Sequence, residues 1–303
     1  MGLTDTIRPS YKAVRKSYRL ITSNVRLLPD FLIIGGQRCG TTSLYYYLTE
    51  QTGIARTLKK EVHFYDDHYA HGLRWYRAQF PTTFQKYYTE RIRKQHFMTG
   101  ESSPYYLFHP LVPERLAAVT PQAKLIILLR NPIDRAYSQH WLTTLEGDET
   151  LPFEEAIERE EERVAGEMEK LIASGKIGND GYKSYKLRHY SYLTRGIYVD
   201  QIQRWMNFFP REQFLILKSE DLYGNPTAIV KQALEFLGLP ESAARAGSQE
   251  FKQYREPNKK GYQNEQKPPK LKPEVRTRLV EYFKPHNARL YKFLDRDFGW
   301  DAL

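Results

Sequence analysis

Cysteine is nearly absent from this chain, which has one, Cys39, among its 303 residues. A single cysteine excludes a disulfide within the chain and is typical of proteins in a reducing compartment. Long apolar runs are missing too: no stretch approaches the roughly 20 apolar residues that a membrane span requires. The first residues also contain no apolar segment of the secretory type. We therefore expect a cytoplasmic protein without a transmembrane segment.

Positive charge is in excess, yet the motifs that accompany nucleic-acid binding are missing. The chain has 46 Lys and Arg against 36 Asp and Glu, a formal net charge of +10. Such a chain can attract nucleic acids, membrane surfaces, acidic glycans or phosphorylated cofactors, but no RNP, zinc-finger or helix-turn-helix pattern is present. We expect no nucleic-acid partner. Basic residues cluster at 8–26 and 252–272, and we assign 1–28 to a basic N-terminal arm and 29–303 to a single domain.

The Walker A pattern of nucleotide kinases is also missing, but another anion-binding pattern lies near the start. Residues 31–34 read as a buried strand, followed by a glycine-bounded turn and a helix. Backbone N–H groups at a helix start suit a phosphate, and glycine lets the anion approach closely. Taken alone, the pattern also fits an ordinary strand-to-helix turn. The candidate cofactor-binding residues of this loop are Gln37, Arg38, Cys39, Gly40, Thr41, Thr42 and Ser43.

A second apolar strand, 124–129, repeats the arrangement. Arg130 follows the strand, and Asn131-Pro132 ends it and starts a helix. Ser138 lies about two turns into that helix, within reach of a ligand bound by Arg130. Singly, Arg130 fits a surface ion pair and Ser138 a solvated helix position. Together with the first loop, they indicate a ligand with two phosphates at the carboxyl ends of parallel strands.

These two segments resemble the 5′-phosphosulfate loop and the 3′-phosphate motif of sulfotransferases that use 3′-phosphoadenosine 5′-phosphosulfate (PAPS). Segments 60–66, 100–106 and 297–301 are similar to the branch that contains the heparan sulfate sulfotransferases and many bacterial relatives. The resemblance runs, in the family's order, from roughly residue 30 to the C-terminus. It implies a P-loop-like three-layer α/β fold, PAPS as donor and 3′-phosphoadenosine 5′-phosphate as product.

The resemblance also implies catalytic roles. Arg38 stands where relatives usually have lysine, and we expect it to neutralise the 5′-phosphate and the leaving oxygen. Arginine keeps its proton at ordinary pH, so this help is electrostatic and through hydrogen bonds. Glu61 matches the general base of the heparan sulfate branch, and His63 matches a histidine near it. The alternatives are a helix-cap or ion-pair residue for Glu61 and a core histidine for His63.

Three further cofactor contacts rest on the resemblance alone. Tyr198 lies near the place where the family contacts the nucleobase, although an aromatic residue there also fits the core. Lys260 and Gly261 fall in a Pro- and Lys-rich stretch, where the related enzymes have a loop that closes over the nucleotide.

Apolar periodicity completes the expected architecture. Strands are expected near 31–35, 97–101, 124–129 and 213–218, and helices at 42–51, 110–119, 133–145, 152–172, 196–208, 226–237 and 273–294. Strands alternating with helices indicate an α/β fold whose mostly parallel sheet is covered on both faces. The very acidic stretch 154–170 is expected to form a surface helix, with a place beside the acceptor cleft as one option.

The expected reaction is in-line transfer of a sulfonate group from PAPS to a hydroxyl or an amine, which depends mainly on positioning and on cations. No metal is expected, although Glu61, Asp66 and Asp67 raise a metal site as an alternative. Glycosaminoglycan-modifying relatives commonly carry lysine where this chain has Ser102, so we expect a small molecule, a lipid or a weakly charged glycan as acceptor. The alternative functions are a nucleotide-dependent kinase and a non-catalytic nucleotide- or carbohydrate-binding protein.

Overall fold

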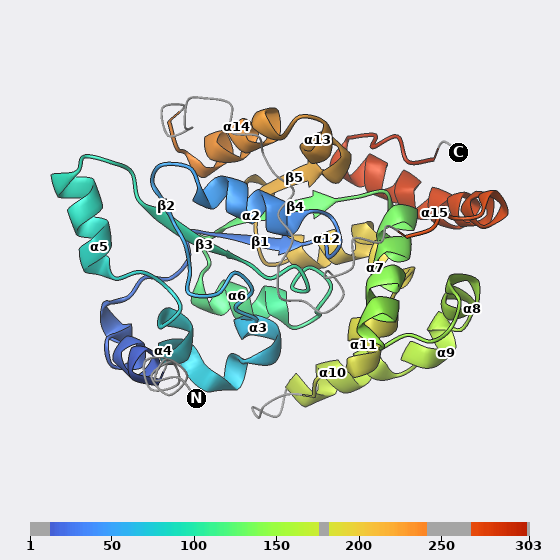
Figure 1. Cartoon of the computed structure of the whole chain (residues 1–303), viewed down its shortest axis with the longest axis horizontal. Coiled ribbons are helices and arrows are strands. Elements are labelled where there is room, and N and C mark those ends of the chain that lie inside the picture. The colour runs from blue at the N-terminus through green and yellow to red at the C-terminus, as the bar shows by residue number, and fades with distance from the viewer. Residues whose placement is uncertain (1–12, 176–181, 241–267, 302–303) are drawn as a thin grey trace, which may run out of the picture.

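A five-stranded parallel sheet lies at the centre of the molecule (Figure 1). The computed structural model describes residues 13–175, 182–240 and 268–301. The strand order is β2-β3-β1-β4-β5. The strands are β1 (Phe31–Gly35), β2 (Ile54–Ala55), β3 (Met98–Ser102), β4 (Lys124–Leu129) and β5 (Phe214–Lys218). All four expected strands are confirmed to within one residue at either end, and the two-residue β2 is an addition.

Alternate side chains of the central strands enter two separate cores. Leu32 and Ile34 point to one core, whereas Phe31 and Ile33 point to the other. This alternation follows from the two-residue period of a strand. Helices α2 (Thr41–Thr49) and α14 (Pro226–Leu237) cover one face, and α6 (Val112–Val119) and α12 (Tyr198–Met206) cover the other (Figure 1). The predicted three-layer α/β fold is therefore confirmed.

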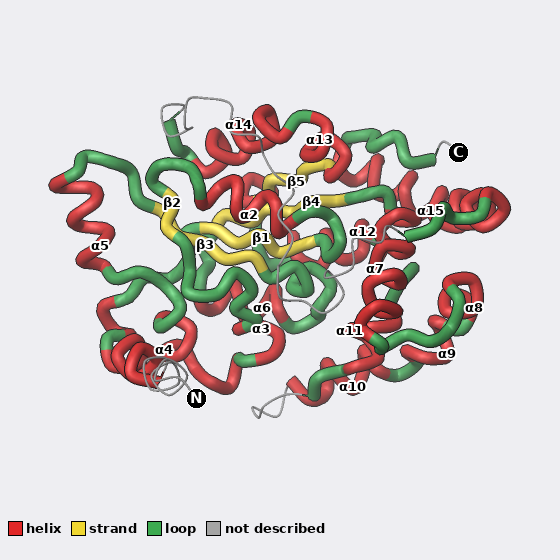
Figure 2. Tube along the Cα trace, in the orientation of Figure 1, coloured by secondary structure: helices red, strands yellow, loops and turns green. Residues whose placement is uncertain are grey.

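The remaining helices surround these layers (Figure 2). The longest are α7 (Pro132–Glu146) and α15 (Pro273–Leu294). Shorter α-helices are α3 (Phe64–Asp67), α4 (Gly72–Arg77), α5 (Thr83–Tyr87), α8 (Phe153–Glu158), α9 (Glu160–Val164), α10 (Glu167–Gly175), α11 (Tyr185–Tyr190) and α13 (Ser219–Gly224). A π-helical turn, η3 (Tyr88–Ile92), continues α5, and 3₁₀ turns form η1 (Ser23–Val25), η2 (Tyr69–His71), η4 (Thr194–Gly196) and η5 (Arg211–Gln213).

The prediction of one helix over 152–172 is wrong. Three short helices, α8, α9 and α10, replace it, and the last break lies at Ala165, whose ψ is 130°, and Gly166, whose φ is +70°. Nor is the acidic stretch wholly on the surface, because Glu160 and Glu167 are buried. The Glu160 carboxylate accepts hydrogen bonds from the backbone N–H groups of residues 192–194. Glu167 accepts hydrogen bonds from the Tyr182 and Ser184 hydroxyl groups, so internal hydrogen bonds rather than solvation explain both acidic residues.

The described part of the N-terminal arm packs on the domain. Residues 13–21 form a helix, from which Arg19 donates hydrogen bonds to the carbonyl oxygens of Ala78 and Phe80. Arg26, after the helix, donates to the same Phe80 oxygen at 2.8 Å. The assignment of 1–28 as an arm and 29–303 as a single domain stays a prediction.

Candidate active site

The first candidate anion-binding loop joins β1 to α2. Gly40 precedes α2 with φ of +89°, and a Cβ on it would lie 2.9 Å from the Tyr223 hydroxyl oxygen, so glycine is required there. Arg38 also has a positive φ, 70°. The N–H groups of the first helical turn have no acceptor within the helix. The loop therefore places the Arg38 cation just before the start of α2, a combination that suits an anion.

The second anion-binding segment lies directly beside the first. The Asn131 side chain accepts a hydrogen bond from Ile133 N and thereby caps α7. Arg130 Nη1 donates to the Arg38 carbonyl oxygen at 3.3 Å, and Arg38 Nε donates to Ser138 Oγ at 3.1 Å. The two segments that the sequence singles out are thus brought together at the carboxyl ends of β1 and β4.

Tyr198 contacts residues of both loops from within the core. Its hydroxyl donates to the Arg130 carbonyl oxygen at 2.8 Å and lies 3.9 Å from Cys39 Sγ. Its ring is only 2% exposed, so in this structure it supports the loops from within the core. The predicted contact with a nucleobase stays a prediction. Burial raises the pKa of Cys39 to about 11, which leaves the thiol protonated and makes it a packing residue. Lys260 and Gly261 lie outside the described residues.

Arg195 is a site residue that sequence reasoning missed. Its guanidinium donates to Gln37 Oε1 in the first loop and to the carbonyl oxygens of Leu187 and Arg188 in α11. Burial lowers its pKa to about 9, and the rings of Tyr105 and Phe108 lie 5.1 and 4.9 Å from it. The arginine ties the first loop to α11. The sequence gives no local signal for this role.

The predicted catalytic residues Glu61 and His63 form one hydrogen-bonded chain with Asp66. His63 Nε2 lies 3.2 Å from Glu61 Oε2, and His63 Nδ1 lies 2.8 Å from Asp66 Oδ2. Burial alone lowers the pKa of His63, but the carboxylates of Asp66 and Glu61 outweigh it and raise this pKa to about 10. His63 is consequently an imidazolium at neutral pH and donates to both carboxylates. It is not an isolated core histidine.

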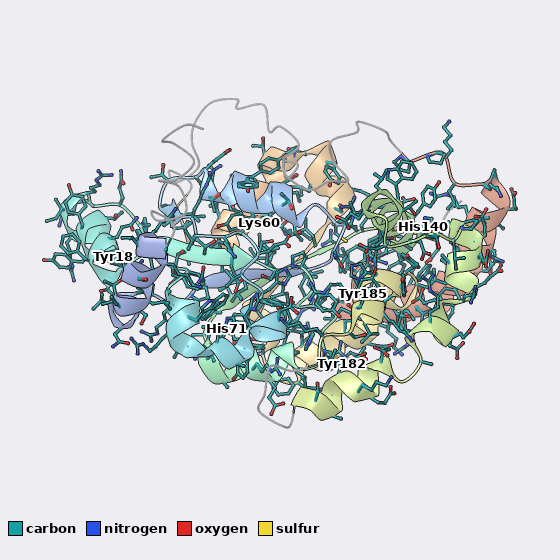
Figure 3. All side chains as sticks on the ribbon, turned by 60° about the horizontal axis from the view of Figure 1, so that its bottom comes forward. Tyr18, Lys60, His71, His140, Tyr182 and Tyr185 are labelled. Carbon is teal, nitrogen blue, oxygen red and sulfur yellow. The ribbon has the colours of Figure 1, made fainter. Side chains whose placement is uncertain are left out.

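Lys60 connects this hydrogen-bonded chain of side chains to the first candidate anion-binding loop. Its Nζ lies 2.5 Å from Thr42 Oγ1 and 2.7 Å from Glu61 Oε1. The lysine side chain is only 5% exposed and lies near the centre of the molecule, close to α2 (Figure 3). One buried cation therefore contacts both the proposed donor loop and the proposed base.

Glu101 holds the segment that carries Glu61 in place. This carboxylate at the end of β3 is fully buried and accepts hydrogen bonds from Val62 N, Tyr76 Oη and Ser103 Oγ at 3.2, 2.7 and 2.7 Å. Ser103 Oγ in turn accepts from His63 N at 3.2 Å. The resemblance marked segment 100–106 without giving Glu101 a role. In the structure it anchors the backbone that directly follows Glu61, at Val62 directly and at His63 through Ser103.

A comparison of the sequence with known protein families identifies the enzyme class. Residues 28–297 match the family described as the sulfotransferase domain. The chain belongs to this family. The expectation of a transferase of the sulfotransferase class is thereby confirmed, and PAPS is the usual donor in this class.

Individual relatives agree with the family. The chain is 26% identical to membrane-associated sulfotransferase kil1 of Dictyostelium discoideum, over 90% of this chain and 66% of the relative. It is 28% identical to human heparan sulfate glucosamine 3-O-sulfotransferase 6, over 91% of this chain and 74% of the relative. A crystal structure of a sulfotransferase from Alicyclobacillus acidocaldarius is 26% identical with a TM-score of 0.64, and the match covers 91% of this chain and all of that one.

Three neighbouring side chains of this sulfotransferase have the donor atoms of a metal site. Ligand atoms of His63, Asp66 and Asp67 lie within 4.8 Å of one another. His63 and Asp66 are paired with each other, and Arg188 Nη2 donates to both Asp67 oxygens at 2.8 and 2.9 Å. These contacts account for the cluster as an ion-pair network. That no metal is required stays a prediction.

Ser102, where we expected the acceptor to be selected, is the last residue of β3 and is fully buried. A lysine at this position would therefore have to extend out of the core. Within the described residues, no helix combines the length and the apolar character needed to cross a membrane. The cytoplasmic location stays a prediction.

Proposed function

We propose that this sulfotransferase moves a sulfonate group from PAPS to a hydroxyl or an amine by in-line displacement, with Glu61 as the general base. The observation that carries the proposal is the position of Lys60, which contacts Thr42 of the donor loop and the Glu61 carboxylate. A base and an anion-binding loop joined through one side chain are arranged for transfer between a bound donor and a nearby acceptor.

The donor side of the proposal rests on the two joined loops. Backbone donors at the start of α2 and the Arg38 guanidinium suit the 5′-phosphate and the developing charge on the leaving oxygen. Arg130 and Ser138 suit the 3′-phosphate, because they lie on the neighbouring strand-to-helix segment and contact Arg38. Charge-assisted hydrogen bonds from arginine favour a doubly charged phosphate over a hydroxyl group.

The acceptor side rests on the Glu61 carboxylate. In this structure, one of its oxygens lies near Lys60 Nζ and the other near His63 Nε2. A carboxylate has further lone pairs for an acceptor hydroxyl, but the adjacent ammonium lowers its basicity, so the base becomes stronger when that contact is lost. Lys60 is the contact placed to leave, since its ammonium also faces the donor loop, where a sulfonate supplies an alternative negative partner. In this account, donor binding draws Lys60 toward the sulfonate and frees the base.

For the acceptor we propose a small molecule, a lipid or a weakly charged glycan. Two cations near the base already have carboxylate partners within the protein: Lys60 contacts Glu61, and Arg188 contacts Asp67. A polyanionic acceptor would compete with these internal pairs for the same cations. The human relative's name includes heparan sulfate glucosamine, but Ser102 replaces the lysine expected for an acidic glycan.

An acceptor screen tests the proposal. The purified protein is incubated with PAPS and a panel of neutral, amine-bearing and polyanionic hydroxyl compounds, and sulfated products are detected by mass spectrometry. We expect transfer to a neutral or weakly charged acceptor whose apparent affinity changes little with ionic strength. Efficient transfer to heparan-type chains, with steep salt inhibition through the acceptor, would contradict the acceptor class.

The same screen separates the two alternative functions. A kinase requires ATP with Mg²⁺ and would phosphorylate an acceptor, whereas a non-catalytic binder would retain the nucleotide and produce no sulfated product. We expect turnover with PAPS that persists in the presence of a chelator. Phosphoryl transfer from ATP, or tight nucleotide binding without turnover of any acceptor, would replace the proposed function by the corresponding alternative.

A further inference from the structure

The helix over residues 13–21 turns its apolar side away from the protein. Val14, Tyr18 and Ile21 recur at the spacing of one helical face, Val25 follows in η1, and all four side chains are 53–75% exposed. The opposite side of the helix carries Arg19, and the buried Arg26 follows the helix; the guanidinium groups of both donate to backbone carbonyl oxygens of the domain. A surface helix ordinarily does the reverse and buries its apolar face. This reversed arrangement indicates that the outward face contacts an apolar partner.

A second exposed apolar group lies beside the first. Phe84, Tyr87, Tyr88 and Ile92 of α5 and η3 are 42–73% exposed. The segments that carry the two groups contact each other: Thr83 Oγ1 donates to the Val25 carbonyl oxygen at 3.2 Å, and Arg26 forms an isolated β-bridge with Thr82. Figure 1 shows the first helix and α5 at the same end of the molecule, and Figure 3 labels Tyr18 at that end. We call these eight side chains the apolar face.

The charge around the apolar face is predominantly positive. Residues 13–29 contain four Lys and Arg and no Asp or Glu, and residues 83–96 contain four Lys and Arg and one acid, Glu90. Lys86 lies 3.9 Å from Glu90. The basic side chains Arg15, Lys16, Arg91, Arg93 and Lys94 are exposed. Aromatic and aliphatic side chains bordered by exposed lysine and arginine are the composition of interfacial membrane-binding surfaces.

We propose that the apolar face docks on a bilayer surface that bears anionic lipid headgroups. Val14, Ile21, Phe84 and Ile92 would enter the headgroup boundary, Tyr18, Tyr87 and Tyr88 would lie at its polar level, and the flanking cations would contact lipid phosphates and carboxylates. A protein partner fits less well, because lysine is depleted in protein–protein interfaces. A second copy of this chain fits less well too, since it would bring two cationic surfaces together.

The position of the apolar face gives the docked enzyme an orientation. The helix over 13–21 precedes β1 and the α5–η3 segment precedes β3, so both lie toward the amino ends of the strands. The anion-binding loops follow β1 and β4 and lie at the carboxyl ends. Figure 3 accordingly shows Tyr18 at one end of the molecule and Lys60 near its centre. Docking would leave the active site open to the aqueous side, and binding and catalysis are therefore separable.

Vesicle co-sedimentation of the full chain tests this proposal. We expect the wild type to bind vesicles of phosphatidylcholine with phosphatidylserine, to bind phosphatidylcholine alone far more weakly, and to lose binding at high salt. Arg91→Gln/Arg93→Gln/Lys94→Gln should weaken binding by about a hundredfold. Ile21→Ser/Phe84→Ser should weaken it by at least about tenfold. Turnover of a soluble acceptor should be unchanged in both variants.

Matched controls come from exposed residues elsewhere on the chain. Lys284→Gln/Lys292→Gln/Arg211→Gln removes the same charge, and Phe208→Ser/Phe293→Ser removes exposed apolar area. Both should bind vesicles like the wild type. Absence of wild-type binding to anionic vesicles, or an equal loss in controls and face variants, overturns the proposal. So does a dimer seen by light scattering that Ile21→Ser/Phe84→Ser dissociates, since a second copy would then cover the face.

Discussion

The Arg38 guanidinium donates from Nε to the Ser138 hydroxyl oxygen at 3.1 Å, although the two residues stand 100 positions apart in the chain. One follows β1 and the other lies in α7 after β4, so the hydrogen bond joins the two strand-to-helix segments that the sequence marks as anion sites. A ligand with two phosphates would bind to both partners at once. We therefore expect the donor specificity of the enzyme to depend on this junction.

The first prediction concerns donor recognition. Wild-type protein should bind 3′-phosphoadenosine 5′-phosphate tightly and adenosine 5′-phosphate much more weakly, as measured by calorimetry. Arg130→Ala should remove most of this discrimination, at a cost of about 1.5–3 kcal/mol for each charged hydrogen bond lost. Arg211→Ala, at an exposed arginine remote from the loops, serves as the control and should bind like the wild type. Equal affinity of the wild type for both nucleotides would contradict the assignment of Arg130 and Ser138 to the 3′-phosphate.

Lys60 provides the second prediction. Lys60→Met keeps much of the buried stem but removes the cation between Thr42 and Glu61, so kcat should fall by roughly 10²–10³. Its neighbour Lys59 is exposed, and Lys59→Met should leave kcat near that of the wild type. If Lys60→Met impairs only nucleotide binding and keeps kcat, Lys60 belongs to the donor loop alone and does not act on the base.

The third prediction is a proton titration of His63, followed by NMR of its imidazole. Asp66 and Glu61 raise the pKa of His63 to about 10, so its ring should stay charged through neutral pH, and Asp66→Asn should shift the midpoint down. Because the folded pKa exceeds the unfolded value of about 6.5, the stabilisation is complete below pH ~6.5 and is lost as the pH rises through about 10. His109, whose pKa burial lowers to about 3, should remain neutral over this range. A wild-type midpoint near 6.5 would contradict the ion-paired state.

The position of the two proposed donor segments could be predicted because their signals are local in sequence. An apolar run, a glycine turn and a hydroxyl-rich helix start specify the loop around Arg38, and a strand followed by Asn-Pro specifies the segment of Arg130. Parallel strands then bring their carboxyl ends to one edge of the sheet. The Arg38–Ser138 contact is a consequence of this topology.

Other parts of the site depend on contacts that no local pattern reveals. Glu101 becomes an anchor only because Tyr76 and Val62 meet it in the folded chain. Arg195 reaches the loop only through its contact with Gln37. The expected helix over 152–172 failed for a similar reason, since the buried Glu160 caps the backbone of residues 192–194. Residue composition identified these acidic and basic side chains but not their partners.

Glu101 gives the fourth prediction, on stability. Burial raises its pKa to about 7, above the unfolded value of about 4.3, so the folded state holds more protons between these values. Stability should therefore fall as the pH rises from about 4.3 through 7, by on the order of 1–3 kcal/mol. Glu101→Gln should abolish this slope in chemical denaturation, whereas Glu114→Gln, at an exposed position, should retain it. If the pH dependence of stability persists in Glu101→Gln, another group causes it.

The central claim, that Glu61 accepts the acceptor's proton beside a donor held by the two loops, is tested most directly by single-turnover transfer from PAPS in Glu61→Gln. The variant keeps the size and hydrogen bonding of the side chain but cannot take up a proton at neutral pH. The rate of the chemical step should fall by roughly 10²–10⁴, with the affinity for 3′-phosphoadenosine 5′-phosphate near that of the wild type. A variant that transfers sulfonate to a hydroxyl acceptor at the wild-type rate would contradict the claim.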